Sequence, residues 1–317
     1  MTHVTRRGLL AGGAAAVALT TLSNPAVADS VPDSGPDGSH ATPELRRLVT
    51  STFRDKTSRN VDRFLAHFSR HLMTYTDGTL GSQFRTWQTL YDLFAQFMPG
   101  WPATGRSYPT RIIGDARSGI VLFTDSPELF GSELRIIAPI DFRDGKIVRE
   151  VDYWDGRHFG AAATGKLRTP KDQFPTNFGE GTVGEQSPPV LRQITSALAT
   201  AFAAGDAAGA AELFTVDAAF EDLTLHTTVV GQPAIRAFLS QSLDLLPYGP
   251  GTSIRHVVGG VQGGGYEWTR KGATVDHGIV AVELDRQARV SRLTTVWDGS
   301  LVDDATITAM LVASIER

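Results

Sequence analysis

Residues 134–156 read LRIIAPIDFRDGKIVREVDYWDG, and residues 277–299 read HGIVAVELDRQARVSRLTTVWDG. Each stretch is an apolar run, a polar turn and an alternating run that ends in aromatic residues, which is the pattern of a β-hairpin. Both close on Trp-Asp-Gly. Because the two stretches match in pattern over their whole length, the chain is predicted to contain one domain built twice.

The first 28 residues have the features of an export signal. Arg6 and Arg7 belong to a twin-arginine motif, and the apolar residues 11–22 are too few and too rich in Ala and Gly to span a bilayer. Small residues at 26–28 fit the rule for signal cleavage, so the mature chain is expected to begin near Asp29. We therefore expect a secreted or cell-envelope protein that folds before export.

Composition excludes several classes of site. The chain has no cysteine, which removes disulfides, thiolate metal sites and a cysteine nucleophile. Its net charge of −4 argues against a nucleic-acid binder, and no other run is apolar enough for a membrane span. His67 and His71 have the spacing of a helical metal pair, but the predicted helix ends near Phe68 and separates them. We expect neither a metal nor an organic cofactor.

Two polar stretches divide the chain. Residues 29–42 and 166–187, rich in Pro and polar residues, are predicted to be linkers, the first of them mobile. They leave domains at residues 43–165 and 188–317, each a comfortable size for one domain.

Both copies are predicted to place helices first and a meander of strands after them. In the first copy the predicted helices are 43–53, 60–68 and 82–98, and the predicted strands are 71–75, 108–113, 119–124, 134–141 and 146–153. In the second copy the predicted helices are 190–204, 207–214, 233–245 and 303–315, and the predicted strands are 218–225, 253–261, 266–268, 275–283 and 289–297. This order is an α+β plan, with about three helices covering one face of a curved antiparallel sheet. Each domain is expected to be a cone with an apolar mouth, a usual place for a small ligand.

Motifs in both copies resemble those of a known superfamily. Residues 213–222 read LFTVDAAFED and residues 231–238 read GQPAIRAF. This pattern is similar to that of the nuclear-transport-factor-2-like superfamily, and within it to ketosteroid isomerases and SnoaL-like polyketide cyclases. In the first copy, residues 137–142 (IAPIDF) resemble an isomerase strand, and residues 145–155 (GKIVREVDYWD) also resemble the limonene epoxide hydrolase branch. The resemblance implies a cystatin-like fold, which hosts many chemistries.

The resemblance to ketosteroid isomerases implies two acidic positions in each copy. An aspartate after the first strand is the general base, which is Asp77 in the first copy and Asp222 in the second. A second, protonated acid deep in the cone donates a hydrogen bond to a developing oxyanion. Asp141 has this position in the first copy and Glu283 in the second.

The residues themselves support part of this assignment. Asp141 and Glu283 both lie in nearly apolar strands, so burial should raise the pKa of either carboxyl. Two acids in settings of different polarity can divide into a base and an acid. Strand alternation can equally place both on the outer face of the sheet, because the register is not known.

Asp152 is implied by the resemblance to the epoxide hydrolase branch, where this position is catalytic. That enzyme also uses an Arg-x-Asp pair on a preceding strand, which has no counterpart here. The second copy has Thr295 at the position of Asp152 and Val296 at the position of Tyr153, so the functions of the copies are expected to differ there. The tyrosine that isomerases carry on the first helix has no match, which argues against a true steroid isomerase.

Aromatic and histidine side chains are candidates for lining the cones. Aromatic residues are more numerous in the first copy, where they are either ordinary core or the lining of a wide apolar mouth. The histidines follow the repeated Trp-Asp-Gly or the predicted base. The candidate substrate-binding residues are Tyr75, Trp87, Tyr91, Trp101, Tyr153, His158 and His226.

The sequence predicts acid–base catalysis on an apolar, oxygenated small molecule such as a polyketide or terpenoid, by cyclisation, isomerisation or dehydration. Epoxide hydrolysis or an epoxide-opening cyclisation is the second hypothesis, and a secreted ligand-binding protein without catalysis is the third. The two domains are expected to pair through their open sheet faces as a pseudo-dimer, with further homodimer formation left open.

Overall fold

The computed structural model describes residues 35–313. The predicted twin-arginine signal lies outside the described residues. Over 35–313, no helix combines the length and the apolar character that crossing a membrane would require.

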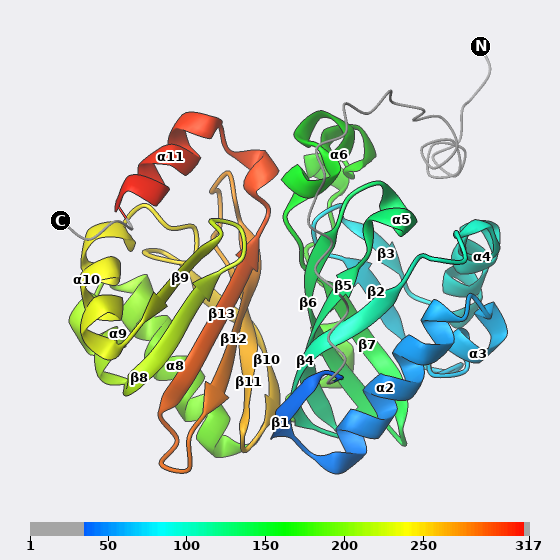
Figure 1. Ribbon diagram of the computed structural model, residues 1–317, viewed down its shortest axis with the longest axis horizontal. Helices are drawn as coiled ribbons and strands as arrows, with labels where there is room; N and C mark the ends of the chain where they lie inside the picture. The colour runs from blue at the N-terminus through cyan, green and yellow to red at the C-terminus, as the bar shows by residue number, and fades with distance from the viewer. Residues whose placement is uncertain (1–34, 314–317) are drawn as a thin grey trace.

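The molecule has two halves, each built on one sheet, with the sheets facing each other and the longer helices on the outside (Figure 1). The first sheet has the strand order β1-β4-β5-β6-β7-β2-β3, and the second has the order β10-β11-β12-β13-β8-β9. The pairs β7–β2 and β13–β8 are parallel and occupy the same place in each half. The fold is α+β, as the sequence predicts.

The elements follow the predicted order. The strands of the first sheet are β1 (Asp37–Ala41), β2 (Thr74–Asp77), β3 (Ser82–Phe84), β4 (Ser107–Asp115), β5 (Ser118–Asp125), β6 (Leu134–Arg143) and β7 (Lys146–Asp152). Those of the second are β8 (Phe214–Asp222), β9 (Thr227–Val230), β10 (Ser253–Gly260), β11 (Gly263–Thr269), β12 (His277–Leu284) and β13 (Val290–Trp297). The helices are α2 (Pro43–Thr57), α3 (Val61–Leu65), α4 (Trp87–Phe97), α5 (Pro127–Phe130), α6 (Ala161–Leu167), α7 (Glu180–Val183), α8 (Pro189–Ala203), α9 (Ala207–Glu212), α10 (Gln232–Ser242) and α11 (Asp304–Ala313).

The first long helix of each half has a proline in its first turn and packs in the same way. Thr42 caps α2 by accepting from the backbone N–H of Leu45, and a proline follows at the first helical position. Leu45 is fully buried under the first sheet, and Leu191 has the same place in α8 of the second half. An apolar stripe at helical spacing thus fixes each helix to the concave face of its sheet.

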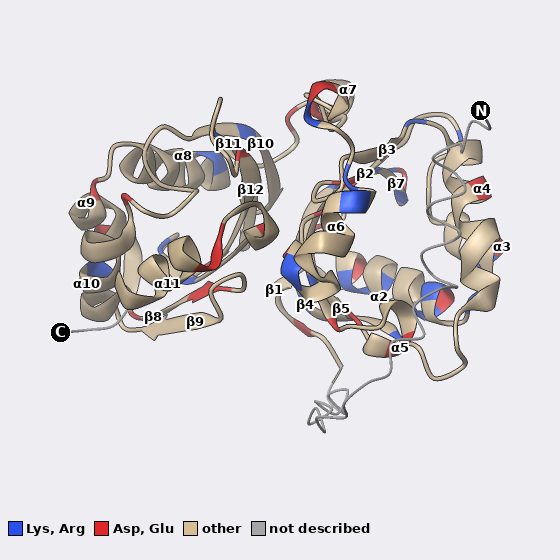
Figure 2. Cartoon of the chain, turned by 90° about the horizontal axis from the view of Figure 1, so that it is seen from above, with Lys and Arg blue, Asp and Glu red and all other residues tan. Residues whose placement is uncertain are grey.

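Three predicted segments differ from the structure. The predicted mobile linker at 29–42 contains β1, which pairs in parallel with β4. The predicted helix 82–98 begins later, because residues 82–84 form the edge strand β3 and Thr86 caps α4. The second predicted linker, 166–187, contains α7 and packs on the sheets, and Figure 2 shows α7 at the seam between the halves.

Each sheet has one face toward its own helices and one toward the other half, and both faces are buried. We call the space on the helix side the first cone or the second cone. On β5, for example, Val121 belongs to the core of the first cone, whereas Ile120 and Leu122 belong to the core between the sheets. Alternation along a strand therefore decides whether a side chain reaches a cone or the seam.

Candidate active site in the first cone

Strand pairing brings a tyrosine and two carboxyl groups together in the first cone. β2 and β7 are parallel neighbours that place Tyr75 beside Glu150. Val151 belongs to the core between the sheets, so Glu150 and Asp152 on either side of it point to the opposite face. Trp154, two residues farther along, lies in the core of the first cone and fixes this direction.

Asp152 is held through one oxygen and is free at the other. The hydroxyl of Tyr75 donates to Asp152 Oδ2 at 2.5 Å. Asp152 Oδ1 is buried and has no hydrogen-bond partner among residues 35–313. An unsatisfied buried carboxyl oxygen is costly, so this atom is placed to take a proton or to bind a polar group of a ligand.

A lysine and a third acid complete the cluster. Lys56, in the last turn of α2, lies with Nζ 3.4 Å from Oδ1 of Asp125 at the end of β5. The same Nζ lies 4.6 Å from the ring centre of Phe123. Lys56 is 9% exposed and Asp125 is 6% exposed. Their charges act on the carboxyl groups of Glu150 and Asp152, so the four side chains form one electrostatic unit.

The two carboxyl groups on β7 differ in acidity. Burial raises the pKa of Asp152 to about 6, against the opposing effects of Lys56 and of the Tyr75 hydrogen bond. Burial and the neighbouring Asp152 charge raise the pKa of Glu150 well above its ordinary value, again opposed by Lys56. Asp152 therefore loses its proton more readily than Glu150, whose pKa the Asp152 charge raises further. A base and an acid stand two residues apart on one strand.

The two predicted bases occupy equivalent places and bind the end of each sheet. Asp77 Oδ1 accepts from the backbone N–H of Leu80 at 2.8 Å and from Trp154 Nε1 at 3.2 Å. Asp222 accepts from two backbone N–H groups of its own turn and from Trp297 Nε1 at 3.2 Å. Burial raises the pKa of Asp77 to about 7 and that of Asp222 to about 6. Their hydrogen bonds point to a structural role.

This turn is itself a repeated motif that the sequence analysis missed. It reads DGTL at residues 77–80 and DLTL at residues 222–225. In both halves the threonine hydroxyl donates to the carbonyl of the tryptophan in Trp-Asp-Gly at 2.7 Å. The turn after the first strand and the end of the last strand thus form one unit, which explains why both were kept in the duplication.

Asp141 and Glu283 do not lie inside the cones, and the expectation that they do is wrong. They have equivalent positions on β6 and β12 and face the other half. Asp141 Oδ2 lies 3.0 Å from His256 Nε2 and 3.5 Å from an amino nitrogen of Arg149. Glu283 Oε1 lies 3.2 Å from Arg111 Nε. Both strands are buried on two faces, so apolar neighbours do not tell which face an acid takes.

The predicted aromatic residues also lie on different faces of the first sheet. Tyr153 lies between the sheets, where its hydroxyl donates to Glu267 Oε1 at 2.7 Å. Trp87 and Tyr91 stack on each other along α4 at 5.0 Å between ring centres, and both are half-buried. Trp101 is buried after α4. Among the predicted aromatic residues, within the described part of the chain, Tyr75 alone bonds to an acid of the cluster.

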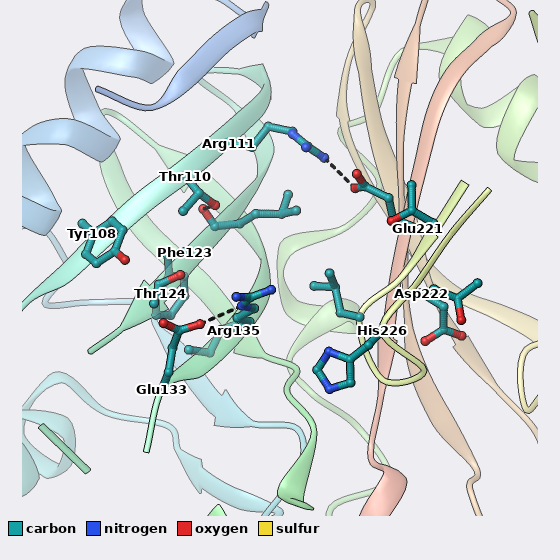
Figure 3. Close-up of a pocket in the computed structure, with 15 residues that line it drawn as sticks. Tyr108, Thr110, Arg111, Phe123, Thr124, Glu133, Arg135, Glu221, Asp222 and His226 are labelled. Atoms are coloured by element: carbon teal, nitrogen blue, oxygen red, sulfur yellow. Dashed lines mark hydrogen bonds and ion pairs between the residues drawn. The ribbon is translucent and has the colours of Figure 1, made fainter. Parts of the chain in front are cut away.

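His158 and His226 meet across the boundary between the halves. Their rings stack, with centres 5.5 Å apart and an interplanar angle of 21°. Burial lowers the pKa of both imidazoles, so they are uncharged near neutral pH. His226 also lines an open groove of about 600 Å³ between the halves (Figure 3). This groove lies outside both cones.

His67, one of the two histidines considered for a metal site, contacts an aspartate. His67 Nε2 lies 2.9 Å from Asp55 Oδ2, which joins α3 to α2. Over residues 35–313 no three His, Cys, Asp or Glu side chains are grouped as ligands for a metal ion.

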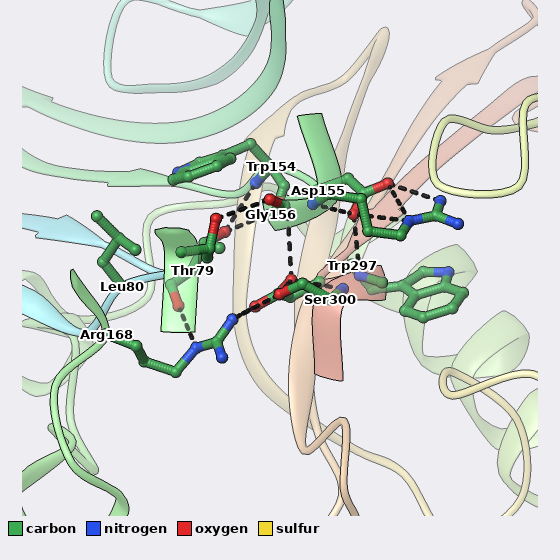
Figure 4. Close-up of polar contacts among 12 residues, drawn as sticks. Thr79, Leu80, Trp154, Asp155, Gly156, Arg168, Trp297 and Ser300 are labelled. Atoms are coloured by element: carbon green, nitrogen blue, oxygen red, sulfur yellow. Dashed lines mark hydrogen bonds and ion pairs between the residues drawn. The ribbon is translucent and has the colours of Figure 1, made fainter. Parts of the chain in front are cut away.

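The repeated Trp-Asp-Gly forms a reciprocal contact between the halves (Figure 4). Asp155 Oδ1 accepts from the backbone N–H of Gly299 at 3.2 Å. Asp298 Oδ1 accepts from the backbone N–H of Gly156 at the same distance. We call this pair of contacts the clasp. Each copy of the motif thus binds the other copy, as in an interface with two-fold symmetry.

An arginine supports each aspartate of the clasp. Arg157 binds Asp155 at 2.7 Å and also donates to the carbonyl oxygen of Thr224 in the other half. Arg168 donates to Asp298. The clasp therefore combines buried carboxylates with charge-assisted hydrogen bonds that cross the seam.

Glu150, Lys56 and Asp125 were missed as candidates. Alternation in residues 146–152 already places Glu150 on the same face as Asp152, so the first could have been inferred from the second. Lys56 and Asp125 come from distant elements, and only the fold of α2 over β5 brings them near.

Comparison with known proteins gives a likeness to solved structures. No known family model matches the chain, and no curated protein matches it. An NTF2-like protein of unknown function from Burkholderia xenovorans LB400 is 20% identical, with a TM-score of 0.31, and covers 35% of this chain and 82% of its own. A protein with a cystatin-like fold from Silicibacter pomeroyi DSS-3 is 18% identical, with a TM-score of 0.31, over 40% of this chain and 82% of its own.

An LEH-like epoxide hydrolase from M. tuberculosis is 21% identical, with a TM-score of 0.31, and covers 37% of this chain and 87% of its own. Each of these structures resembles a little over a third of the chain, which is the size of one half.

Proposed function

We propose that the first cone performs acid–base catalysis on an apolar, oxygenated small molecule. The observation that carries this proposal is the pair on β7, in which Asp152 has a buried Oδ1 without a partner among the described residues and the pKa of Glu150 beside it is raised well above its ordinary value. The Cα atoms of residues two apart on a strand lie about 7 Å apart and their side chains point to the same face, so both carboxyls can reach one reacting group. The apolar core of the cone suits a polyketide-like or terpenoid substrate.

Asp152 is the proposed base. Its free Oδ1 accepts a proton from the substrate, while the hydrogen bond from Tyr75 to Oδ2 orients the carboxylate. Glu150 is the proposed acid and gives its proton to a developing oxyanion or leaving hydroxyl. Lys56 limits the rise in pKa of both carboxyls. Isomerisation, cyclisation and dehydration all need this removal and return of a proton.

Epoxide opening is the second candidate, and the Tyr75–Asp152 pair favours it. Asp152 would take a proton from a water molecule or a substrate hydroxyl. The oxygen of that water or hydroxyl would bond to an epoxide carbon as the ring C–O bond at this carbon breaks. Glu150 would protonate the epoxide oxygen that is released. Asp152 has the position that the resemblance to the epoxide hydrolase branch singles out, and Tyr75 holds it at 2.5 Å.

A substrate panel tests both candidates. We would assay purified protein against enones, hydroxyketones and terpenoid epoxides, together with Asp152→Asn, Glu150→Gln and the control Thr295→Ala in the second cone. Turnover that is lost in the first two variants and kept in the third supports catalysis in the first cone. Binding without turnover would leave a ligand-binding protein, and turnover that survives Asp152→Asn would refute the role of this residue.

We also propose export by the twin-arginine route and a chain that acts as a pseudo-dimer of its two halves. The motif at residues 5–10 supports the first proposal, and the reciprocal clasp supports the second. Secretion that continues after Arg6→Lys with Arg7→Lys would contradict export by this route. Sedimentation of the chain as a single 34.1 kDa species, or less after signal cleavage, would show that no second copy is needed.

A further inference from the structure

The seam between the halves has two equivalent sides. By the register of the sheets, Arg111 on β4 corresponds to His256 on β10, and Arg135 on β6 corresponds to His277 on β12. The clasp has the same symmetry, because Asp155 binds Gly299 and Asp298 binds Gly156. A surface feature on one side of the seam therefore has a counterpart on the other.

A segment between α6 and α7 fills the side next to His277. Phe178 is fully buried there, and its carbonyl oxygen accepts from Arg149 Nε at 3.0 Å. Its ring lies 4.1 Å from the Arg255 guanidinium. The ring centre of Phe174 lies 5.2 Å from that of His277. This side of the seam thus holds aromatic rings and a peptide carbonyl under arginine side chains.

The side next to Arg135 is open in the described part of the chain. Its groove of about 600 Å³ is formed by β4, β5 and β6 of one half and by the β8–β9 hairpin of the other (Figure 3). Thr110 stands here at the position of Arg255. This smaller side chain leaves room for a ring, and the volume lies within the range of small-molecule sites.

Both arginines of the open groove are paired with acids. Arg111 is 3.4 Å from Glu221, and Arg135 is 2.8 Å from Glu133. A strongly charged ligand would have to displace one of these pairs, so the groove favours a neutral one. His226 points into the groove from the hairpin and offers a ring nitrogen for a hydrogen bond (Figure 3).

We propose that the open groove binds a neutral aromatic molecule that carries a carbonyl or hydroxyl oxygen. Its ring lies against Thr110, where Phe178 would lie by analogy, and its oxygen accepts a hydrogen bond from Arg135 or His226. The site is on the opposite face of the first sheet from the acids on β7, so it is separate from the proposed catalytic site and does not depend on it.

Binding of N-acetyl-L-phenylalanine amide to the whole chain tests the proposal, since this probe has the ring and carbonyls that fill the other side. NMR titration should show one molecule bound per chain, with the largest shift changes at His226. Thr228→Trp places a bulky ring on the exposed groove side of β9 and should weaken binding at least tenfold. Val230→Trp, also exposed on β9 but outside the groove, is the matched control and should leave binding unchanged.

A second experiment removes the Phe178 ring from the filled side of the seam. Phe178→Ala should let a folded chain bind two molecules of the probe, because it opens the equivalent groove; folding is checked by circular dichroism. A folded variant that still binds one molecule would refute the equivalence of the two sides. If this variant does not fold, the Thr228→Trp comparison decides: equal affinity of both tryptophan variants, shifts confined to the first cone, or no binding by the native chain would each overturn the proposal.

Discussion

The two cones share their strands, their register and the turn that binds the last tryptophan, yet they differ in three neighbouring positions. The positions in the first cone and their equivalents in the second are Tyr75 and Phe220, Glu150 and Leu293, and Asp152 and Thr295. In the first cone these positions hold a hydrogen-bonded tyrosine and two acids, and in the second they hold two apolar residues and a threonine.

The difference shows which acids of the repeat serve structure. Asp77 and Asp222 occur in both cones and bind Trp154 and Trp297, so they belong to the shared framework. Asp152 has an equivalent that is not acidic. Thr295 donates its hydroxyl to the carbonyl of Ile279 on the neighbouring strand. Duplication thus separates the shared framework from the side chains that only the first cone carries at these positions.

A double variant removes the difference between the cones by giving the first cone two residues of the second. The double variant Glu150→Leu with Asp152→Thr should lose activity by about 10³-fold, the middle of the range for removing a general acid or base. Its free energy of unfolding at pH 7 should rise, because two buried carboxyls with raised pKa are removed. Steady-state kinetics and urea unfolding measure both effects. Activity that survives would show that the cones do not differ in function.

The clasp tests the opposite expectation, that the halves are alike at the seam. Asp155→Ala and Asp298→Ala should each lower the free energy of unfolding by about 3 kcal/mol, because each removes a buried carboxylate that binds both an arginine and a backbone N–H of the other half. Denaturant melts of the single and double variants check this. If the clasp is one cooperative unit, the double variant should lose less than the two single losses added together.

The opposite graft tests whether the second cone tolerates an acid. Thr295→Asp should lower the free energy of unfolding by about 2 kcal/mol at pH 7, since Phe220 offers no hydroxyl to the new carboxyl and Asp222 lies beside it. Burial would raise the folded pKa above the unfolded one. The loss should therefore be largest above the folded pKa and should shrink as the pH falls toward the unfolded pKa near 4. Melts from pH 7 to pH 4.5 measure this slope, with Thr295→Asn as the control without charge.

The sequence predicts the repeated halves and most strands, because Trp-Asp-Gly and the alternating runs are local patterns. It does not predict β3, a three-residue edge strand whose pairing partner is β2. It also misplaces Asp141, whose strand is apolar on both faces because a sheet packs on one side and helices on the other. The pair Lys56–Asp125 depends on contact between distant elements, which no local pattern contains.

The smallest expected effect comes from Tyr75→Phe, which copies the phenylalanine that the second cone has at this position. The hydrogen bond from Tyr75 lowers the pKa of Asp152, so its loss should move that pKa above about 6. The acidic limb of the pH–kcat/KM profile should then shift to higher pH. Activity below pH 6 should fall several-fold, in keeping with about 1 kcal/mol for one hydrogen bond, and activity at pH 7 should fall less. The alkaline limb, set by Glu150, should stay in place. A profile that drops uniformly without a shift would mean that Tyr75 only packs the cone and does not tune the base.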